Sequence, residues 1–271
     1  MRHADGKSVA VGFFDGVHLG HRAILEGADA ALTFRNHPLS VLAPEKAPRL
    51  IMPFEDRIAA IRECGVGEVT ALDFTPGMAA LSPEEFAAAH FPSGVEIRCG
   101  GNWRFGRGGE GGAAWLRAHG YGVAVLPFAT YAGERISSSR IRECLRRGEI
   151  GAANAMLGRR FSVSGDVFSG KGEGAALGFP TVNMAVDAPV APGVYEVEAG
   201  GARAVANYGV APTFGGRAWE RPVLEVHFPG LAAPPRFGRV EFVRFMRPER
   251  KFGSVEELKR QIAADCATIQ A

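Results

Sequence analysis

The chain has 271 residues, which at about 150 residues per domain predicts two domains that can each bury a core. Hydrophobic residues make up 46% and charged residues 22%, a balance typical of globular proteins that excludes a collagen, a coiled coil and an unstructured tail. The net charge of +2 is too small for a dedicated nucleic-acid binder. Since the sequence shows neither a leader nor a long apolar run, we expect a cytoplasmic protein with no membrane partner. Four cysteines lie far apart without a C-x-x-C pair, which predicts reduced, mostly buried thiols.

From Val9 to about Leu157, β-rich runs alternate with helical stretches, as in a parallel α/β sheet. Strands are expected at residues 8–13, 30–34, 68–74, 95–99 and 121–128. Helices are expected from about 21, over 54–64, from 83, near 115, and over 139–147 and 150–157. Ser82 and Glu85 form a capping-box pattern around Pro83, which fixes the start of the third of these helices.

After Gly158 the sequence changes to short strands separated by glycine and proline, which predicts an antiparallel β-barrel or sandwich. The strands are expected within residues 160–168, 180–186, 193–200, 202–210, 222–228 and 239–246. Ser254 and Glu257 form a second capping-box pattern, which predicts a terminal helix running towards Ile269. We therefore expect two domains, residues 1–157 and 158–271.

The first strand runs into a glycine-containing turn, residues 12–21, that leads directly into a helix. A helix start offers unpaired N–H groups and a positive dipole end, so His18 and His21 could bracket a phosphate there. Donors fixed at this point would stabilise the charge that gathers on an α-phosphate during nucleotidyl transfer. Alternatively, Gly16 and Gly20 only shape a turn and the two histidines are exposed loop residues.

Three strings decide between these readings: GFFDGVHLGHRAIL from Gly12, GNWRFG from Gly101 and RISSSRIR from Arg135. In this order they closely resemble the bifunctional riboflavin kinase/FAD synthetase family of bacteria, whose first domain is a Rossmann-like HxGH nucleotidyltransferase. The resemblance implies that His18 and His21 stabilise the transferring α-phosphate and that Asn102 holds ATP phosphates or the attacking FMN phosphate. It also implies an ATP and phosphate site that includes Gly12, Asp15, Gly20, Arg135, Ser138, Ser139 and Arg140. Hydroxyls at a helix start beside a guanidinium independently suit a pyrophosphate.

The segment after His21 is shorter than in most members of that family, because only residues 22–32 separate it from Thr33. A parallel crossover needs about 10–12 residues, so the connection closes but predicts a stunted first helix. The string TFRNHP from Thr33 matches the family's TFxxHP stretch, which implies a flavin-binding or structural role for His37.

The second half carries a glycine-dense string from Ser164 to Gly174, followed by LGFPTVN. Dense glycines let main-chain amides wrap a phosphate chain, although ordinary turns share this spacing. LGFPTVN resembles the core motif of riboflavin kinases, which implies that Thr181 and Asn183 lie at a Mg²⁺–ATP site, with Mg²⁺ as the cofactor. The ATP-binding residues implied are Gly170, Gly172, Gly174, Gly178 and Pro180.

In LEVHF, strand alternation places Glu225 and His227 on one face and the apolar residues on the other. The string again resembles the family, which implies that Glu225 is the general base for the riboflavin 5′-hydroxyl. Arg247, in the family-like RPERKF string, is expected to contact flavin. The chain departs from the usual family pattern at Ala175, at Ala211 and over residues 231–238.

The leading hypothesis is a two-step enzyme that phosphorylates riboflavin to FMN and adenylylates FMN to FAD, with riboflavin, FMN, FAD, ATP, ADP and pyrophosphate as its small-molecule partners. One alternative is a riboflavin kinase whose first domain transfers adenylyl groups slowly. Another is a flavin- or nucleotide-binding regulator without turnover. A nucleic-acid-binding barrel is disfavoured, since only RVEFVRFMR interleaves basic and aromatic residues. The oligomeric state is left open.

Overall fold

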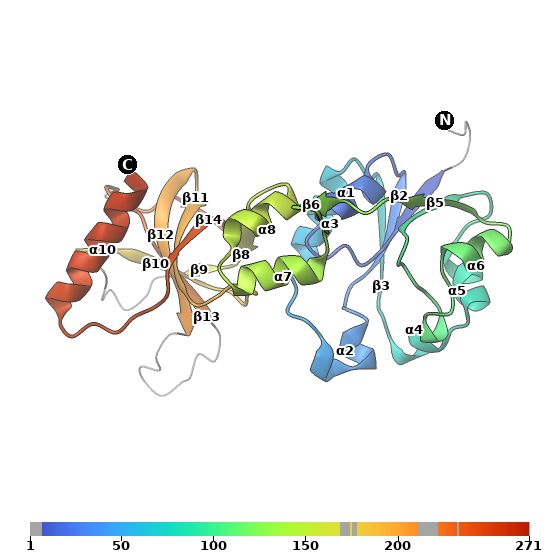
Figure 1. Ribbon diagram of the computed structural model, residues 1–271, viewed down its shortest axis with the longest axis horizontal. Helices are drawn as coiled ribbons and strands as arrows, with labels where there is room; N and C mark the ends of the chain where they lie inside the picture. Colours follow the sequence, from blue (N-terminus) through green and yellow to red (C-terminus); the bar gives the residue numbers. More distant parts are fainter. Residues whose placement is uncertain (1–6, 169–173, 175–177, 211–221, 232, 271) are drawn as a thin grey trace. The chain divides into compact units, whose positions relative to one another are not determined.

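A computed structural model describes residues 7–168, 174, 178–210, 222–231 and 233–270 (Figure 1). The chain divides into two compact units, residues 1–138 and 139–271. Each unit is described by itself. The boundary that the sequence suggests for the two activities, between residues 157 and 158, stays a prediction.

The first unit is built on a five-stranded parallel sheet with the strand order β3-β2-β1-β4-β5. The strands are β1 Ser8–Val11, β2 Ala30–Phe34, β3 Glu68–Leu72, β4 Glu96–Gly100 and β5 Gly122–Leu126. All five were expected from the sequence. Because the chain winds outwards in both directions from β1, a topological switch point lies between β1 and β4, where open α/β sheets bind their ligands.

Helices cover both faces of this sheet (Figure 1). On one face, α1 (Leu19–Leu25) and α3 (Phe54–Glu63) pack on alanines of β1 and β2. On the other face, α5 (Pro83–His90) and α6 (Ala113–Ala118) bury the aromatic cluster around Phe86 and Phe105. The short remaining elements are α2 Leu39–Leu42, η1 Pro44–Lys46, α4 Pro76–Ala80, η2 Arg107–Gly109, β6 Thr130–Tyr131 and β7 Glu134–Arg135.

Side-chain caps fix the starts of two of these helices. The capping box of α5 is confirmed: Glu85 N–H donates to Ser82 Oγ at 3.2 Å and Ser82 N–H donates to Glu85 Oε2 at 2.8 Å. The stunted first helix is also confirmed, since α1 has 7 residues. It starts at Leu19, two residues earlier than expected, because His18 acts as its N-cap.

The second unit begins with two helices, α7 (Ser138–Arg146, continuous with the first unit) and α8 (Ile150–Leu157), which are followed by a seven-stranded antiparallel sheet. The sheet order is β8-β14-β11-β12-β13-β10-β9. The strands are β8 Phe161–Ser164, β9 Val167–Phe168, β10 Thr181–Ala185, β11 Gly193–Ala199, β12 Ala202–Val210, β13 Pro222–His227 and β14 Arg239–Arg247. Only Gly165 and Asp166 separate β8 from β9, so the sheet curls to bring its two edges together, consistent with the expected barrel.

The terminal helix α10 (Val255–Gln270) packs Ile262, Cys266 and Ile269 against the barrel. Its predicted capping box forms only in part. Glu257 N–H donates to Ser254 Oγ at 3.2 Å, but the Glu257 carboxylate accepts from Gly253 N–H at 3.0 Å.

All four cysteines are buried thiols that form no disulfide within the described residues, as predicted. Burial raises the pKa of Cys99, Cys144 and Cys266. Within the described residues, none of the helices combines the length and the apolar character needed to cross a bilayer.

Candidate active sites

The loop between β1 and α1 lies at the switch point of the first sheet. It carries residues 12–18 away from the carboxyl end of β1, while Gly100 to Asn102 leave the neighbouring β4. Parallel strands present their carboxyl ends at one edge of a sheet, so the HxGH loop and Asn102 share that edge. Asn102 is exposed there.

The two histidines of the loop stack on one another at the start of α1. Their ring centroids are 3.6 Å apart, with an interplanar angle of 16°. His18 Nδ1 accepts the main-chain N–H of His21 at 3.2 Å. Since a neutral imidazole carries one proton, this contact places it on Nε2, which makes His18 a donor on its other side.

His21 is held neutral by its surroundings. Its pKa is lowered well below 6.5 by burial, followed by the nearby charges of His18, Arg135 and Arg57. The edge of its ring meets Phe14 at a centroid distance of 5.4 Å. Among the described residues, His21 Nδ1 is buried without a hydrogen-bond partner. Such an atom fits a site that is completed by a ligand.

Two glycines of the loop make room for aromatic rings. A Cβ at Gly20 would lie 3.2 Å from Cε1 of His18, and a Cβ at Gly12 would lie 2.9 Å from the ring of Phe14. Gly12 and Gly20, which are both predicted to contact phosphate, are therefore covered by the rings of Phe14 and His18. Gly20 is the position that lets His18 fold back over the helix start.

Asp15 lies inside the loop rather than on its surface. It is 2% exposed, and its Oδ1 accepts the N–H of Ile51 at 2.9 Å. Ser138, the last residue of the first unit, donates from its Oγ to the Asp15 carbonyl at 2.9 Å. In this arrangement the Asp15 side chain anchors the main chain.

The remaining predicted residues of this site have distinct surroundings. The Arg135 guanidinium lies 3.6 Å from the ring centroid of Phe128. His37 Nδ1 accepts the N–H of Leu39, the first residue of α2, at 3.1 Å, and the His37 ring packs edge-on to Phe13 at 4.8 Å. Ser139 and Arg140 belong to the second unit, where Ser139 Oγ accepts from Arg142 at 3.2 Å.

Sequence reasoning missed Arg57, which is fully buried below this loop. Its signal is positional: on α3, Arg57 shares a face with the buried Ala60 and Ile61, so it stands in the apolar stripe of the helix.

In the second unit, strand register assembles a row of polar residues across three strands. Asn183 on β10 lies directly opposite Glu225 on β13, which in turn lies opposite Asn207 on β12. Directly paired residues point to the same face of a sheet. As expected from alternation, Glu225 is exposed while Leu224 and Val226 are buried on the other face.

The neighbouring pair of residues on the same face lies beside the turn that precedes β10. Thr181 pairs with His227, and His227 Nδ1 donates to the Pro180 carbonyl at 2.9 Å. Gly174 N-terminal to this turn is tightly enclosed, because a Cβ there would lie 2.5 Å from the Phe179 carbonyl oxygen. Gly178 adopts a φ of 91°, which glycine tolerates best. Gly170 and Gly172 lie outside the described residues.

The donors on this face suit a hard cation. Asn183 is 6% exposed, and its Oδ1 is buried without a partner within the described part of the chain. The Thr181 hydroxyl lies one pleat away on the same strand face. An amide oxygen and a hydroxyl are ligands that Mg²⁺ accepts alongside water and phosphate oxygens.

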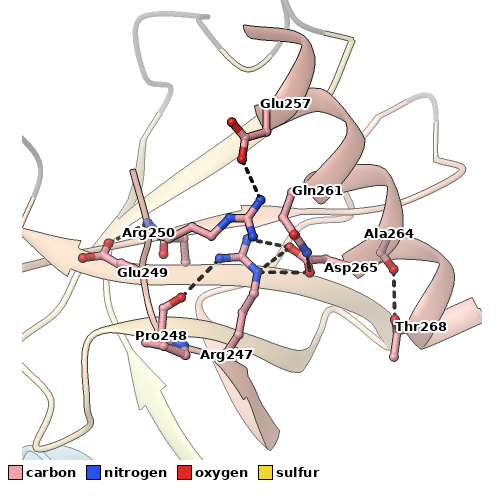
Figure 2. A network of polar contacts seen from close by, with 10 residues as sticks. Arg247, Pro248, Glu249, Arg250, Glu257, Gln261, Ala264, Asp265 and Thr268 are labelled. Atoms are coloured by element: carbon pink, nitrogen blue, oxygen red, sulfur yellow. Dashed lines mark hydrogen bonds and ion pairs between the residues drawn. The ribbon is translucent and has the colours of Figure 1, made fainter. Parts of the chain in front are cut away.

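Arg247 is tied to the terminal helix (Figure 2). Its Nε donates to both oxygens of Asp265 at 3.1 Å and its Nη2 donates to Oδ2 at 2.7 Å. Glu249 accepts from Asn207 Nδ2 at 3.1 Å, and its carboxylate lies so close to Gly209 that a Cβ there would meet Oε1 at 2.2 Å. The end of β14 is thereby joined to α10, and the segment that follows it is joined to the row that contains Glu225.

Comparison with known proteins gives a consistent result over the whole chain. Residues 1–140 match the FAD synthetase family, and residues 157–271 match the riboflavin kinase family. Proteins named bifunctional riboflavin kinase/FMN adenylyltransferase are 33% identical in Escherichia coli strain K12 and 32% identical in Bacillus subtilis strain 168. The alignments cover 96% and 98% of this chain and 91% and 92% of those proteins. A crystal structure titled macrolide-efflux protein from Streptococcus pneumoniae has a TM-score of 0.83 and 26% identity, covering 99% of this chain and 95% of that one.

These matches confirm the enzyme class predicted from the sequence motifs. A FAD synthetase domain and a riboflavin kinase domain stand in the order in which the motifs occur. The chain belongs to the bifunctional riboflavin kinase/FMN adenylyltransferase family of bacterial transferases.

Proposed function

We propose that this chain converts riboflavin and ATP to FMN and ADP in its second unit, and FMN and ATP to FAD and pyrophosphate at the HxGH loop of its first unit. We also propose that it works in the cytoplasm, where ATP is supplied. Family membership supports both activities, and the residue roles below rest on the geometry of the two sites.

Adenylyl transfer is supported chiefly by the stacked histidine pair at the start of α1. An oxygen of the FMN phosphate attacks the α-phosphorus of ATP, a new O–P bond forms, and the bond to the β-phosphate oxygen breaks, releasing pyrophosphate. His18 Nε2–H and the main-chain N–H groups of the helix start donate to the α-phosphate oxygens as they gain charge. Asn102, Arg135, Ser138, Ser139 and Arg140 are proposed to hold the remaining phosphates.

Phosphorylation of riboflavin is supported by the row of Asn183, Glu225 and Asn207. The Glu225 carboxylate accepts the proton of the riboflavin 5′-hydroxyl while that oxygen attacks the γ-phosphorus, and ADP leaves with the bridging oxygen. The strand pairing on both sides fixes where Glu225 stands. His37 and Arg247 are proposed flavin contacts of the first and second unit.

We propose Mg²⁺ as the divalent metal, with the Thr181 hydroxyl and Asn183 Oδ1 as its protein ligands. When bound with ATP, it neutralises charge on the phosphates. The glycine-rich stretch that includes Gly174 and Gly178, with Pro180 behind it, is proposed to hold the ATP phosphates.

The test is incubation with Mg²⁺–ATP and either riboflavin or FMN, followed by chromatographic separation of the flavins. Glu225→Gln is expected to abolish FMN formation and leave the conversion of FMN to FAD intact. His18→Asn retains an N-cap acceptor for α1 but removes the Nε2 donor, and is expected to lower FAD formation at least ~100-fold while sparing the kinase. Each variant is the control for the other.

The outcomes separate the alternatives. FMN without FAD from the unmodified protein would leave a kinase alone, an outcome for which the 7-residue α1 gives a physical reason. Mg²⁺–ATP binding without any new flavin would support a regulator that has no turnover. Salt-dependent binding of oligonucleotides would revive the nucleic-acid alternative.

A further inference from the structure

The side chain of Arg57 is unusual in its surroundings. It is 0% exposed, and no described carboxylate forms an ion pair with it. Asp15 is the acidic group whose charge acts on it. Burial lowers the Arg57 pKa to about 10, so the guanidinium stays charged at neutral pH. A buried cation that is not in direct contact with a carboxylate is costly, and such groups mark positions with a task beyond stability.

The guanidinium holds the main chain at the carboxyl edge of the parallel sheet, where the candidate adenylyl-transfer site lies. Arg57 Nη1 donates to the Phe13 carbonyl at 3.1 Å, and Nη2 donates to the carbonyls of Phe34 and Arg35 at 2.7 and 3.0 Å. The Phe13 carbonyl follows β1, and the carbonyls of Phe34 and Arg35 lie at the end of β2. One side chain therefore joins the carboxyl ends of two neighbouring strands. The guanidinium also lies 4.0 Å from the centroid of the Phe13 ring.

The loop that it holds is strained. Phe14 has a φ of 58° and Val17 has a φ of 38°, both in the left-handed region. Such values are rare for a β-branched residue and persist only where surrounding contacts enforce them. Three contacts do so at the start of the loop: Arg57 and Thr33 donate to the Phe13 carbonyl, and Val17 N–H donates to the Phe14 carbonyl at 3.0 Å.

The charge of Arg57 also reaches the reacting end of the loop. It acts on the ring of His21 together with His18, which stacks on it, and with Arg135 from β7. Asp15, buried in the same loop, is the counter-charge on the Arg57 side. A fixed positive charge below a phosphate site favours an anion there and disfavours a cationic imidazole.

We propose that Arg57 is a positioning residue for adenylyl transfer: its fork of donors holds the strained HxGH loop in shape, and its buried charge favours the anionic phosphates of the nucleotide. This inference rests on the proposed adenylyltransferase activity. It assigns to α3 a part in the reaction although Arg57 lies in none of the three strings HxGH, GNWRFG and RISSSR.

Two variants distinguish the effect of the hydrogen bonds that Arg57 donates from the effect of its positive charge. Arg57→Lys keeps a cation but cannot donate to three carbonyls, whereas Arg57→Met removes both. We expect kcat/KM for FAD formation from FMN to fall ~10-fold in the lysine variant and ~100-fold in the methionine variant, the size of loss that a misplaced reacting group produces. Riboflavin phosphorylation by the same molecules is the internal control and should stay within about twofold.

The pH profile gives a readout that a purely structural role would not move. Since Arg57 lowers the pKa of His21, its removal raises that pKa, so the acidic limb of the FAD-forming profile should shift to higher pH in Arg57→Met and stay in place in Arg57→Lys. If the methionine variant does not fold, the lysine variant decides through its FAD-forming rate relative to its kinase rate.

Two results would overturn the inference: unchanged FAD formation in both variants, or a loss of FAD formation matched by an equal loss of kinase activity with an unmoved pH profile. Absence of FAD formation by the unmodified protein is a different result, because it refutes the proposed function itself.

Discussion

Replacing Asp265 by alanine should release the end of β14 from the terminal helix. Asp265 is 6% exposed and accepts three hydrogen bonds from Arg247 and one from Gln261 at 2.9 Å (Figure 2). The alanine variant leaves a largely buried guanidinium without its counter-charge. The perturbation therefore tests whether this pair holds α10 in place.

The magnitude follows from the burial of the two partners. Removing one member of a buried ion pair costs about 3–5 kcal/mol. The Arg247 side chain keeps 20% exposure and a hydrogen bond to the Pro248 carbonyl, so the low end, about 3 kcal/mol, applies. For a unit of about 130 residues, each kcal/mol shifts Tm by roughly 3–4 °C, so the second unit should melt ~10 °C earlier.

Glu257→Ala on the same helix is the matched control. Its ion pair with Arg250 is exposed, with side-chain exposures of 41% and 47%, and its other contact is one exposed hydrogen bond from Gly253 N–H, so removing the carboxylate should cost about 1–2 kcal/mol. Calorimetry measures the transitions, and hydrogen exchange of α10 and β14 peptides assigns them to the second unit.

Equal destabilisation by Asp265→Ala and Glu257→Ala would refute the reasoning, because the buried pair would then contribute no more than the exposed one. A shift of the first unit's transition by the same amount would refute it as well. If Arg247 contacts flavin as proposed, the riboflavin KM should also rise in Asp265→Ala, while FAD formation from FMN is unchanged.

Three further changes test other contacts. His227→Asn keeps a donor near the Nδ1 position and should retain the KM for ATP in the kinase reaction, whereas His227→Gln places its amide elsewhere and should raise that KM up to ~10-fold. Equal kinetics of the two variants would contradict a role for the hydrogen bond from His227 to the Pro180 carbonyl. Burial raises the pKa of Glu196, but hydrogen bonds from two arginines outweigh burial and leave it below 4.5, so its stabilisation is present above pH 4.5 and lost as pH falls through the lower folded pKa. Denaturant midpoints should therefore fall more steeply in acid for the unmodified protein than for Glu196→Gln, and parallel curves would speak against this. Gly20→Ala should crowd His18 and lower FAD formation ~10-fold without affecting the kinase, while Gly151→Ala, in open space on α8, should change neither activity; similar effects of the two substitutions would show that crowding is not the cause.

The sequence predicts most elements of this fold because their signals are local. Alternating polar and apolar residues identify the strands, and the serine of each capping box marks the start of α5 or α10. The short segment between His21 and Thr33 correctly predicts a short α1. Its start was misplaced by two residues because histidine is not among the usual N-cap residues, so His18 gave no capping signal.

The parts of the site that depend on three-dimensional assembly could not be predicted. Asn207 lies opposite Glu225 only through the pairing register of β12 and β13, and register is set by packing across the whole sheet. Arg57 belongs to a helix whose other charged residues suggest a solvated face, so its burial follows from the way α3 packs on the sheet. The residue roles within both sites stay predictions.

Because His18 caps α1 through its Nδ1, protonation of that nitrogen would be coupled to local unfolding of the helix. The nitrogen that accepts the main-chain N–H of His21 can do so only while it carries no proton. Adding a proton to His18 Nδ1 would set two donors against each other at the first turn of a helix that is only 7 residues long. Acidification would thus fray this turn at the same step that alters the charge of the ring, and inactivation at low pH would be accompanied by faster amide exchange in α1.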